Sequence, residues 1–161
     1  MTSEEAKIFA GVLFKPGDPE LRAIKLRSHN LCSRYNRTFE DETELRDQLL
    51  DDILGYRGKN VFMQGPIFFH YGRHTSIGDN FFGNYNLTIQ DDAKVTIGNN
   101  VNFGPNVTIV TPIHPMLPNE RNQMLDEQGV PSRFCYAKPV TIGNTIWFGA
   151  NVVVCSGVTI G

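Results

Sequence analysis

Residues 97–109 read IGNNVNFGPNVTI, and a large apolar residue followed by glycine recurs there after six positions. The same period returns further along the chain, where Ile142, Phe148, Val154 and Ile160 lie six residues apart. A period of six fits neither an α-helix nor long alternating strands. It fits very short strands joined by turns, with glycine or asparagine at the tight corners. One such strand cannot bury its apolar face alone, whereas stacked coils can, so the pattern predicts a mainly β solenoid.

The spacing also predicts the size of a coil. Ile77 and Val95 are 18 residues apart, as are Ile142 and Ile160, which indicates coils of three six-residue units. We expect about four coils, which at ~4.8 Å between strands stand roughly 19 Å high. The period slips by two residues after Val95 and is interrupted over residues 111–138, which hold four prolines. A loop of that length in a compact solenoid is usually functional.

The charged residues are unevenly distributed. Residues 1–60 hold 21 of the 32 charged side chains and 4 of the 15 glycines, whereas residues 61–161 hold 11 of each. This change of composition predicts an α-helical N-terminal cap over residues 1–60 and the β-helix with its extruded loop over residues 61–161. A first short helix is expected around residues 3–10.

Two longer helices are predicted in the cap. Asp18-Pro19-Glu20 is typical of a helix start, since it supplies an N-cap carboxylate, a proline in the first turn and an acid facing the helix dipole. A second helix over about residues 41–54 is predicted to begin with Asp41 and Glu44 as a capping box. Gly55 would provide its left-handed C-terminal cap.

Charge and cysteine content narrow the class of protein. With 161 residues, 18.1 kDa, a net charge of −2 and a pI near 6.1, the chain fits one globular domain. It lacks the clustered positive charge with which proteins bind nucleic acids and anionic membranes. No apolar run is long enough for a transmembrane helix, and the acidic start is unlike a secretory signal. The three cysteines form no Cys-x-x-Cys motif, so we expect reduced thiols in a cytoplasmic protein.

Four histidines are candidates for catalysis or metal binding. His114 lies in Thr111-Pro112-Ile113-His114-Pro115, where prolines stiffen the start of the long loop and an imidazole suits proton abstraction near neutral pH. His29 lies in a predicted helix and is expected to be structural. A zinc site would need three histidines at one height, but His70, His74 and His114 are separated by 4 and 40 residues. They do not converge within one chain, although a metal site shared between chains stays open.

Together these features resemble one known family. The Ile-Gly hexads, the helical cap, Asn80-Phe81-Phe82-Gly83-Asn84, Asp91-Asp92 and the His-Pro loop are similar to those of the maltose and galactoside O-acetyltransferases and the nodulation acetyltransferases. The resemblance covers essentially the whole chain. It implies a left-handed parallel β-helix and a homotrimer with active sites between subunits. It also implies acetyl-CoA as co-substrate, no metal, and a small hydroxylated acceptor such as a sugar.

The resemblance also implies roles for particular residues. His114 falls on the family's catalytic histidine and would be the general base of a direct transfer. Asn84 would stabilise the transition state and contact the substrate. Asp92 matches an acidic residue that binds sugar hydroxyls, and Trp147 and Ala150 match the segment along which the pantetheine arm of acetyl-CoA lies. No serine or cysteine is placed to form an acyl-enzyme.

The chain also departs from the family pattern. Lys15-Pro16-Gly17-Asp18 stands where some relatives carry a substrate-binding aspartate, and His70 replaces a small or acidic residue of the sugar pocket. Cys135 stands where many relatives carry a glutamate that orients the catalytic histidine, so either a backbone carbonyl is expected to orient His114 or His114 is expected to be a weaker base. The chain stops in mid-hexad at Gly161, and only five Lys or Arg follow residue 60 to hold the phosphates of CoA. We expect the natural sequence to continue.

Two alternatives stay open. One is a zinc-dependent hydratase similar to the γ-class carbonic anhydrases, which use the same fold. The other is a non-catalytic β-helix that only binds its ligand, which Cys135 and the unfinished last coil would favour.

Overall fold

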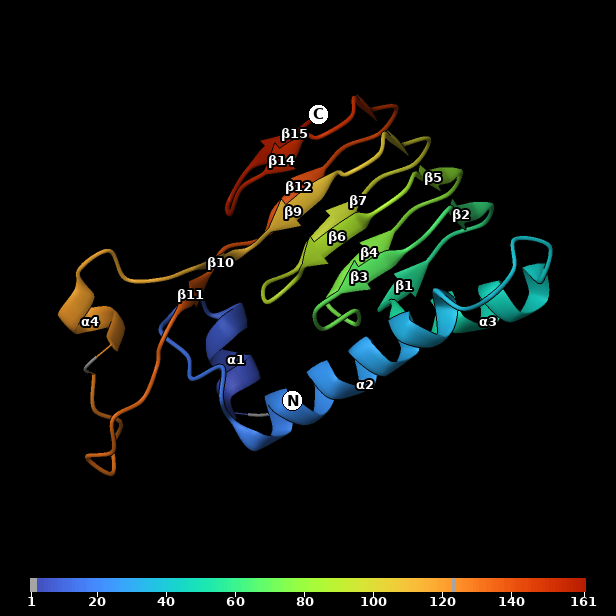
Figure 1. Ribbon diagram of the computed structural model, residues 1–161. Helices are drawn as coiled ribbons and strands as arrows, with labels where there is room; N and C mark the ends of the chain where they lie inside the picture. Colours follow the sequence, from blue (N-terminus) through green and yellow to red (C-terminus); the bar gives the residue numbers. More distant parts are fainter. Residues whose placement is uncertain (1–2, 123) are drawn as a thin grey trace.

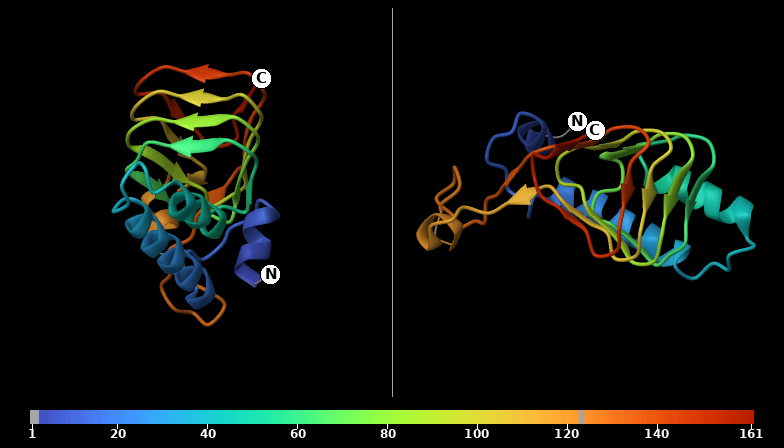
Figure 2. Two further views of the ribbon diagram at one scale, coloured as in Figure 1. Left: turned by 90° about the vertical axis from the view of Figure 1, so that its right-hand side faces the viewer. Right: turned by 90° about the horizontal axis from the view of Figure 1, so that it is seen from above.

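The computed structural model describes residues 3–122 and 124–161. A column of stacked coils has helices packed over its N-terminal end, while the last coil lies at the opposite end (Figures 1 and 2). A long arm projects sideways from the column (Figure 1). Among the described residues, no helix combines the length and the apolar character needed to cross a membrane.

The helices of the N-terminal part form close to where the sequence predicts them. They are α1 (Ser3–Phe9), α2 (Pro19–Tyr35) and α3 (Thr43–Ile53). The predicted start of α2 is confirmed, because Asp18 Oδ1 accepts hydrogen bonds from the backbone N–H of Glu20 and Leu21 at 3.0 and 3.2 Å. These bonds satisfy two of the N–H groups that the first turn of a helix leaves free.

Two predicted details of α3 are wrong. Its N-cap residue is Glu42, which makes no side-chain cap hydrogen bond, so Asp41 and Glu44 do not form a capping box. The C-cap residue is extended (φ −83°, ψ 149°), and Gly55 is not left-handed. Glycine is required at 55 for a different reason: a Cβ there would lie 2.2 Å from the carbonyl oxygen of Arg73. The chain passes straight from the helix into the first strand, so no reversing cap forms.

Short parallel strands form three sheets, one on each side of the column. The first sheet contains β1 (Tyr56–Arg57), β4 (Thr75–Ile77), β7 (Val95–Ile97), β12 (Val140–Ile142) and β15 (Thr159–Ile160). The second contains β2 (Val61–Met63), β5 (Phe81–Gly83), β8 (Asn102–Phe103) and β13 (Trp147–Phe148). The third contains β3 (Ile67–Phe69), β6 (Leu87–Gln90), β9 (Thr108–Val110) and β14 (Val153–Val154). The predicted left-handed parallel β-helix is confirmed.

The large apolar residues of the six-residue repeat fill the inside of the column. Phe81, Phe103 and Phe148 belong to successive coils of the second sheet, with ring centroids 5.1 and 4.8 Å apart. All three are buried, as are Ile97 and Ile142 of the first sheet. The period of six therefore reflects strands whose alternate side chains point inward, two in most three-residue strands, and burial of these columns is the main favourable term for the fold.

The coil length was predicted wrongly for most of the column. Ser76 pairs with Thr96 and Phe82 with Asn102, so the early coils contain 20 residues. Only the last coil returns to 18, where Thr141 pairs with Thr159. The two extra residues widen the corner between the third and first sheets. The two-residue slip in the six-residue period after Val95 results from these extra residues. Ile77 and Val95 therefore do not occupy equivalent positions.

The corners that flank the second sheet are turned mainly by asparagine, whereas Gly72 and Gly157, with positive φ, lie in corners between the third and first sheets. Asn60, Asn80 and Asn100 have positive φ and form a ladder in which each side chain bonds the next at 3.0 Å. Asparagine tolerates this left-handed conformation better than most residues. The repeat glycines have a different role: a Cβ on Gly98 would lie 2.6 Å from the carbonyl oxygen of Gly143 on the next coil. They permit the close approach of stacked coils.

The extruded loop forms an arm, which we define as the described residues of 111–138. Its two ends pair as the antiparallel strands β10 (Pro112–Ile113) and β11 (Tyr136–Ala137), and it carries the short helix α4 (Pro118–Asn122). Cys135 also pairs with Phe14 in an antiparallel bridge. Lys15 Nζ lies 2.7 Å from Asp126 Oδ2. The arm is therefore joined to the segment that follows α1.

Candidate functional site

The wide corners between the third and first sheets gather polar side chains along one edge of the column. We call this the arm edge; it comprises residues 70–74, residues 91–94 and the root of the arm, residues 111–114. The backbone N–H of Ala93 donates to Thr111 Oγ1 at 2.9 Å, which places the root of the arm beside Asp92. The two extra residues of each early coil create the room for this cluster.

Asp92 is buried without full hydrogen bonding. Its side chain belongs to a residue only 3% exposed, and its Oδ2 has no hydrogen-bond partner in the described part of the chain. Burial, followed by the neighbouring charge of Asp91, raises the pKa of Asp92 to about 7. A buried carboxyl oxygen without a hydrogen-bond partner lowers the stability of the fold. Such an oxygen is able to accept a hydrogen bond from the hydroxyl group of a ligand.

Three side chains surround this carboxyl. The hydroxyl of Tyr71 is buried and, among the described residues, also lacks a hydrogen-bond partner. Burial is the largest cause that raises the pKa of the Cys135 thiol to about 12. The charge of Asp92 also raises this pKa, whereas the charge of Lys25 lowers it. Lys25 Nζ lies 5.7 Å from the centre of the Tyr71 ring and donates to the carbonyl oxygen of Pro16 at 2.7 Å. Asp92 Oδ2 and the Tyr71 hydroxyl are thus buried polar atoms without hydrogen-bond partners among the described residues.

The neighbouring Asp91 and His74 have structural roles. Asp91 accepts hydrogen bonds from the Tyr71 N–H at 2.7 Å and from Thr75 Oγ1 at 2.8 Å. His74 Nδ1 faces the carbonyl oxygens of both aspartates at 3.0 and 2.8 Å, and its Nε2 lies 2.9 Å from Glu5 Oε1. Because acceptors face both ring nitrogens, His74 ties α1 to the arm edge and has no nitrogen free to act as a base.

His114 lies just beyond β10, near the root of the arm, and its side chain is exposed. No residue of 3–122 or 124–161 forms a hydrogen bond with its ring, including the backbone carbonyl that we expected to orient it. The adjacent Pro115 is buried, which anchors the backbone next to the histidine. The imidazole is therefore held at the arm edge and is open to a ligand or to a second copy of the chain.

Asn84 lies at the opposite edge of the third sheet, which we call the far edge; it comprises residues 84–86, 104–107 and, with the adjoining strand β13, 147–152. The Oδ1 atom of Asn84 accepts the N–H of Tyr85 at 2.8 Å, so its amide NH2 group is the part available as a donor. Ala150 belongs to the same edge two coils further on, and Trp147 precedes it on β13 with 77% of its surface exposed. Three of the predicted site residues thus share this edge.

The predicted site residues therefore fall into two groups, which we refer to as the two half-sites of the predicted site. Asp92 and His114 lie at the arm edge, whereas Asn84, Trp147 and Ala150 lie at the far edge, with the strands of the third sheet between them (Figure 1). A single chain does not bring His114 and Asn84 together. Most residues of the far edge are exposed or half-exposed, whereas most residues of the arm edge are buried and Arg73, Lys94 and His114 are its exposed members.

Sequence reasoning missed Tyr71, Lys25 and the partner of His70. Tyr71 stands 20 residues before Asp91, which is one coil, so the correct coil length would have placed them together; the predicted length of 18 did not. His70 Nδ1 lies 3.2 Å from His29 Nε2 on α2. His29 was expected to be only structural, and no signal in the sequence indicates how α2 lies across the third sheet.

Comparison with known proteins agrees with this geometry. The maltose acetyltransferase hexapeptide capping motif matches residues 7–58. Galactoside O-acetyltransferase of Escherichia coli (strain K12) is 39% identical over 155 residues, which is 96% of this chain and 72% of that protein. Nodulation protein L of Rhizobium meliloti (strain 1021) is 36% identical over 119 residues, which is 74% of this chain and 65% of that protein. The chain thus spans roughly two thirds to three quarters of the length of these relatives.

Solved structures give the same result. A galactoside acetyltransferase in complex with coenzyme A superposes with a TM-score of 0.88 at 37% identity, covering 100% of this chain and 76% of that one. A maltose O-acetyltransferase from Clostridium difficile 630 gives 0.88 at 34% identity over 99% of this chain and 81% of that one. The fold, together with these matches, defines a hexapeptide-repeat acyltransferase. Within that class, the chain belongs to the family of the galactoside and maltose O-acetyltransferases.

The structure gives no support to the zinc alternative. Across residues 3–122 and 124–161, no group of three or more His, Cys, Asp or Glu side chains is arranged to hold a metal ion. His70 is paired with His29, His74 with Glu5, and His114 stands apart on the arm.

Proposed function

We propose that the chain is an acetyl-CoA-dependent O-acetyltransferase that acetylates a hydroxyl group of a sugar or a similar small acceptor. The observation that carries this proposal is the superposition of the whole chain on a galactoside acetyltransferase in complex with coenzyme A. The two half-sites support it, since they supply a base, an amide donor and a carboxyl, which are the groups that acyl transfer to a hydroxyl requires.

The active site would form between copies of the chain in a homotrimer. The arm edge of one copy carries Asp92 and His114, and the far edge of its neighbour would supply Asn84, Trp147 and Ala150. A closed ring of three copies joins every arm edge to a far edge and leaves none unpaired. The exposed Trp147 ring, which lies on the outer face of β13, would be covered by acetyl-CoA and the neighbouring copy.

The chemical step would be a direct transfer. A ring nitrogen of His114 takes the proton of the acceptor hydroxyl as that oxygen bonds to the thioester carbonyl carbon. The carbonyl oxygen gains negative charge, and the Asn84 amide NH2 donates a hydrogen bond to it. When the intermediate collapses, the carbon–sulfur bond breaks and the proton returns from the imidazole to the departing CoA sulfur. Asp92 would hold a second hydroxyl of the acceptor.

An acyl-cysteine intermediate is disfavoured by the state of the two buried thiols. Cys32 and Cys135 are almost inaccessible, and burial is the largest cause that raises the pKa of each. A protonated, inaccessible thiol is a poor nucleophile. Cys155 is exposed and follows β14 on the last coil, so this argument applies to Cys32 and Cys135 alone.

Release of the CoA thiol with a panel of sugars tests the proposal. We expect His114→Ala to lower kcat by roughly 10²- to 10⁴-fold with an unchanged circular dichroism spectrum. Gln128→Ala, at an exposed position on the same arm, is the matched control and should retain full activity. Equal rates for the wild type and His114→Ala would remove this histidine from the mechanism, and a wild type that acetylates no sugar would refute the proposed acceptor class.

Co-expression of two inactive variants tests the shared site. His114→Ala and Asn84→Ala chains each lack one half-site, but a mixed trimer rebuilds some complete sites at the junctions between copies. Random mixing should restore about a quarter of the sites. No recovery of activity in mixed trimers of verified composition would show that both residues act within one chain or that one of them is not needed.

A further inference from the structure

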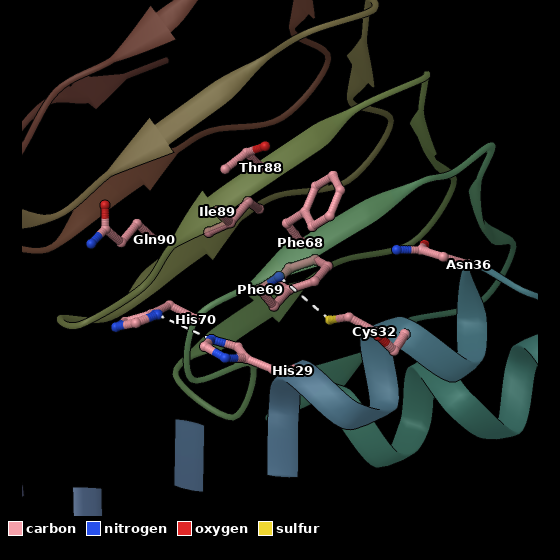
Figure 3. Close-up of a pocket in the computed structure, with 10 residues that line it drawn as sticks. His29, Cys32, Asn36, Phe68, Phe69, His70, Thr88, Ile89 and Gln90 are labelled. Atoms are coloured by element: carbon pink, nitrogen blue, oxygen red, sulfur yellow. Dashed lines mark hydrogen bonds between the residues drawn. The ribbon is translucent and has the colours of Figure 1, made fainter. Parts of the chain in front are cut away.

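His114 differs from the other histidines of the chain in how its ring is held. His29 and His70 face one another, with 3.2 Å between Nε2 and Nδ1 (Figure 3). His74 Nε2 lies 2.9 Å from Glu5 Oε1. The ring of His114 is exposed and, in the part of the chain that the structure describes, has no hydrogen-bond partner. Its position therefore depends on the backbone that carries it.

The backbone beside His114 is joined to the segment that follows α1. β10 and β11 pair with Ile113 opposite Tyr136. The same register, continued by one residue, places His114 opposite Cys135. Cys135 in turn bridges to Phe14, and the two N–H···O distances of this bridge are 3.0 and 3.1 Å. Phe14 is fully buried in a core cluster that also contains Cys135, so its side chain anchors this third segment.

Lys15 follows this bridge directly and holds the outer part of the arm. Its Nζ lies 2.7 Å from Oδ2 of Asp126, whose side chain is 9% exposed. Asp126 also accepts hydrogen bonds from the N–H of Val130 at 2.9 Å and from Ser132 Oγ at 3.1 Å. Asp126 thus fixes the turn at the end of the arm, and Lys15 fixes Asp126.

The lysine is held on its other side by α1. Its backbone N–H donates to Glu4 Oε2 at 2.6 Å, while its ammonium group reaches Asp126 on the arm. A lysine–carboxylate pair that is supported by further hydrogen bonds is held more firmly than an isolated pair on the surface. Lys15 therefore connects α1, the end of the arm and the segment beside Cys135. In the sequence, it stands out only as a departure from the family pattern.

We propose that Lys15 is a positioning residue for acetyl transfer: through its ion pair with Asp126 it holds the arm against the segment that follows α1, and so keeps His114 where the acceptor hydroxyl is deprotonated. The proposal rests on the proposed function, because His114 is the base of that reaction. A base must lie within hydrogen-bond reach of the proton it removes, and a displacement of about 1 Å can lower the rate by roughly 10²-fold. Lys15 itself takes no part in the transfer of the acetyl group or of the proton.

Steady-state kinetics with acetyl-CoA and methyl β-galactoside test the role of the pair. Lys15→Met keeps the length of the side chain and removes its charge, so we expect kcat to fall by about tenfold. The KM for acetyl-CoA should not change, because the residues predicted to contact acetyl-CoA lie at the far edge. Lys15→Arg should retain most of kcat, because a guanidinium group also donates to a carboxylate. Arg27→Met removes an exposed ion pair with Asp52 away from the arm and is the matched control, with full activity expected.

A double-mutant cycle shows whether Lys15 and Asp126 act through each other. Asp126→Asn should also lower kcat by about tenfold, and the double variant should be no slower than the slower single variant, whereas independent effects would multiply to about 100-fold. Hydrogen exchange reports on the arm without reference to activity. The Cys135 N–H, which donates to the Phe14 carbonyl oxygen, should exchange about tenfold faster in Lys15→Met, with exchange in the column unchanged.

The outcomes separate this inference from the proposed function. An active wild type whose kcat is retained in Lys15→Met and Asp126→Asn would overturn the positioning role and leave acetyl transfer in place. Effects that multiply in the double variant, or unchanged exchange at Cys135, would overturn it as well. A wild type that acetylates no sugar in the panel would instead refute the proposed function, and the positioning role with it.

Discussion

Replacing Asp92 by asparagine should stabilise the fold in a way that depends on pH. The carboxyl of Asp92 has a pKa of about 7 in the folded chain, against an ordinary value of 3.8. Because the folded state holds its proton more tightly than the unfolded state does, the free energy of unfolding falls as pH rises from about 4 to about 7. Each pH unit between the two values costs about 1.4 kcal/mol, so the full penalty above pH 7 is about 4 kcal/mol.

Asparagine has the same shape and does not ionise, so Asp92→Asn removes this penalty. At pH 8 we expect the variant to be more stable than the wild type by about 4 kcal/mol, and by less than about 1 kcal/mol at pH 4. The assay is urea unfolding at pH 4, 5, 6, 7 and 8 at one protein concentration, because assembly alters apparent stability. The test depends on how the difference in unfolding free energy between variant and wild type changes with pH. The new amide group itself shifts that difference by the same amount at every pH.

Asp126→Asn is the control with the opposite sign. The hydrogen bond from Lys15 is the largest cause that lowers the pKa of Asp126 to about 2. Its carboxylate therefore adds stability above the unfolded value, and this stability is lost as pH falls. Asp126→Asn should be less stable than the wild type at pH 7 and nearly equal to it at low pH. If the Asp92→Asn difference does not change between pH 4 and pH 8, the Asp92 carboxyl is ionised normally and the reasoning fails.

Three further predictions concern the column and its thiols. Thr145 has φ +60° at the position that continues the Asn100 ladder, so Thr145→Asn should raise stability by about 1 kcal/mol in urea unfolding; a loss would contradict the ladder. Gly98→Ala should cost about 1–3 kcal/mol because its Cβ would meet the next coil, whereas Gly149→Ala, with nothing within 4 Å, should be near neutral in the same assay. In the native protein, a thiol reagent should label Cys155 and spare the two buried cysteines; labelling of all three without denaturant would show that the arm edge opens.

The sequence was informative where a local rule decided the outcome. The six-residue period predicted short strands stacked in a column because only an inward side chain on every short strand can bury the apolar repeat. Asp18 was identified as a helix cap from its own neighbours. His114 and Asn84 were selected as site candidates by residue type and by resemblance. These features depend on a few adjacent residues, and distant contacts do not alter them.

The sequence was less informative where distant segments meet. Nothing local indicates that Gly55 approaches Arg73, so it was taken for a cap. The pairing of His29 with His70 depends on how α2 crosses the third sheet, which propensity and period do not specify. The pKa of Asp92 depends on burial first, then on the charge of Asp91, and burial is a property of the packed chain.

The sequence by itself determined the kind of coil and the chemical groups available for a reaction, because periodicity and residue type are carried by the chain order. Only the tertiary structure decided the coil length of 20 residues and the resulting register. That register places Asp92 and His114 on one edge and Asn84, Trp147 and Ala150 on the other. The physical reason is that two extra corner residues cost little locally, whereas they set which side chains lie above one another along the whole column.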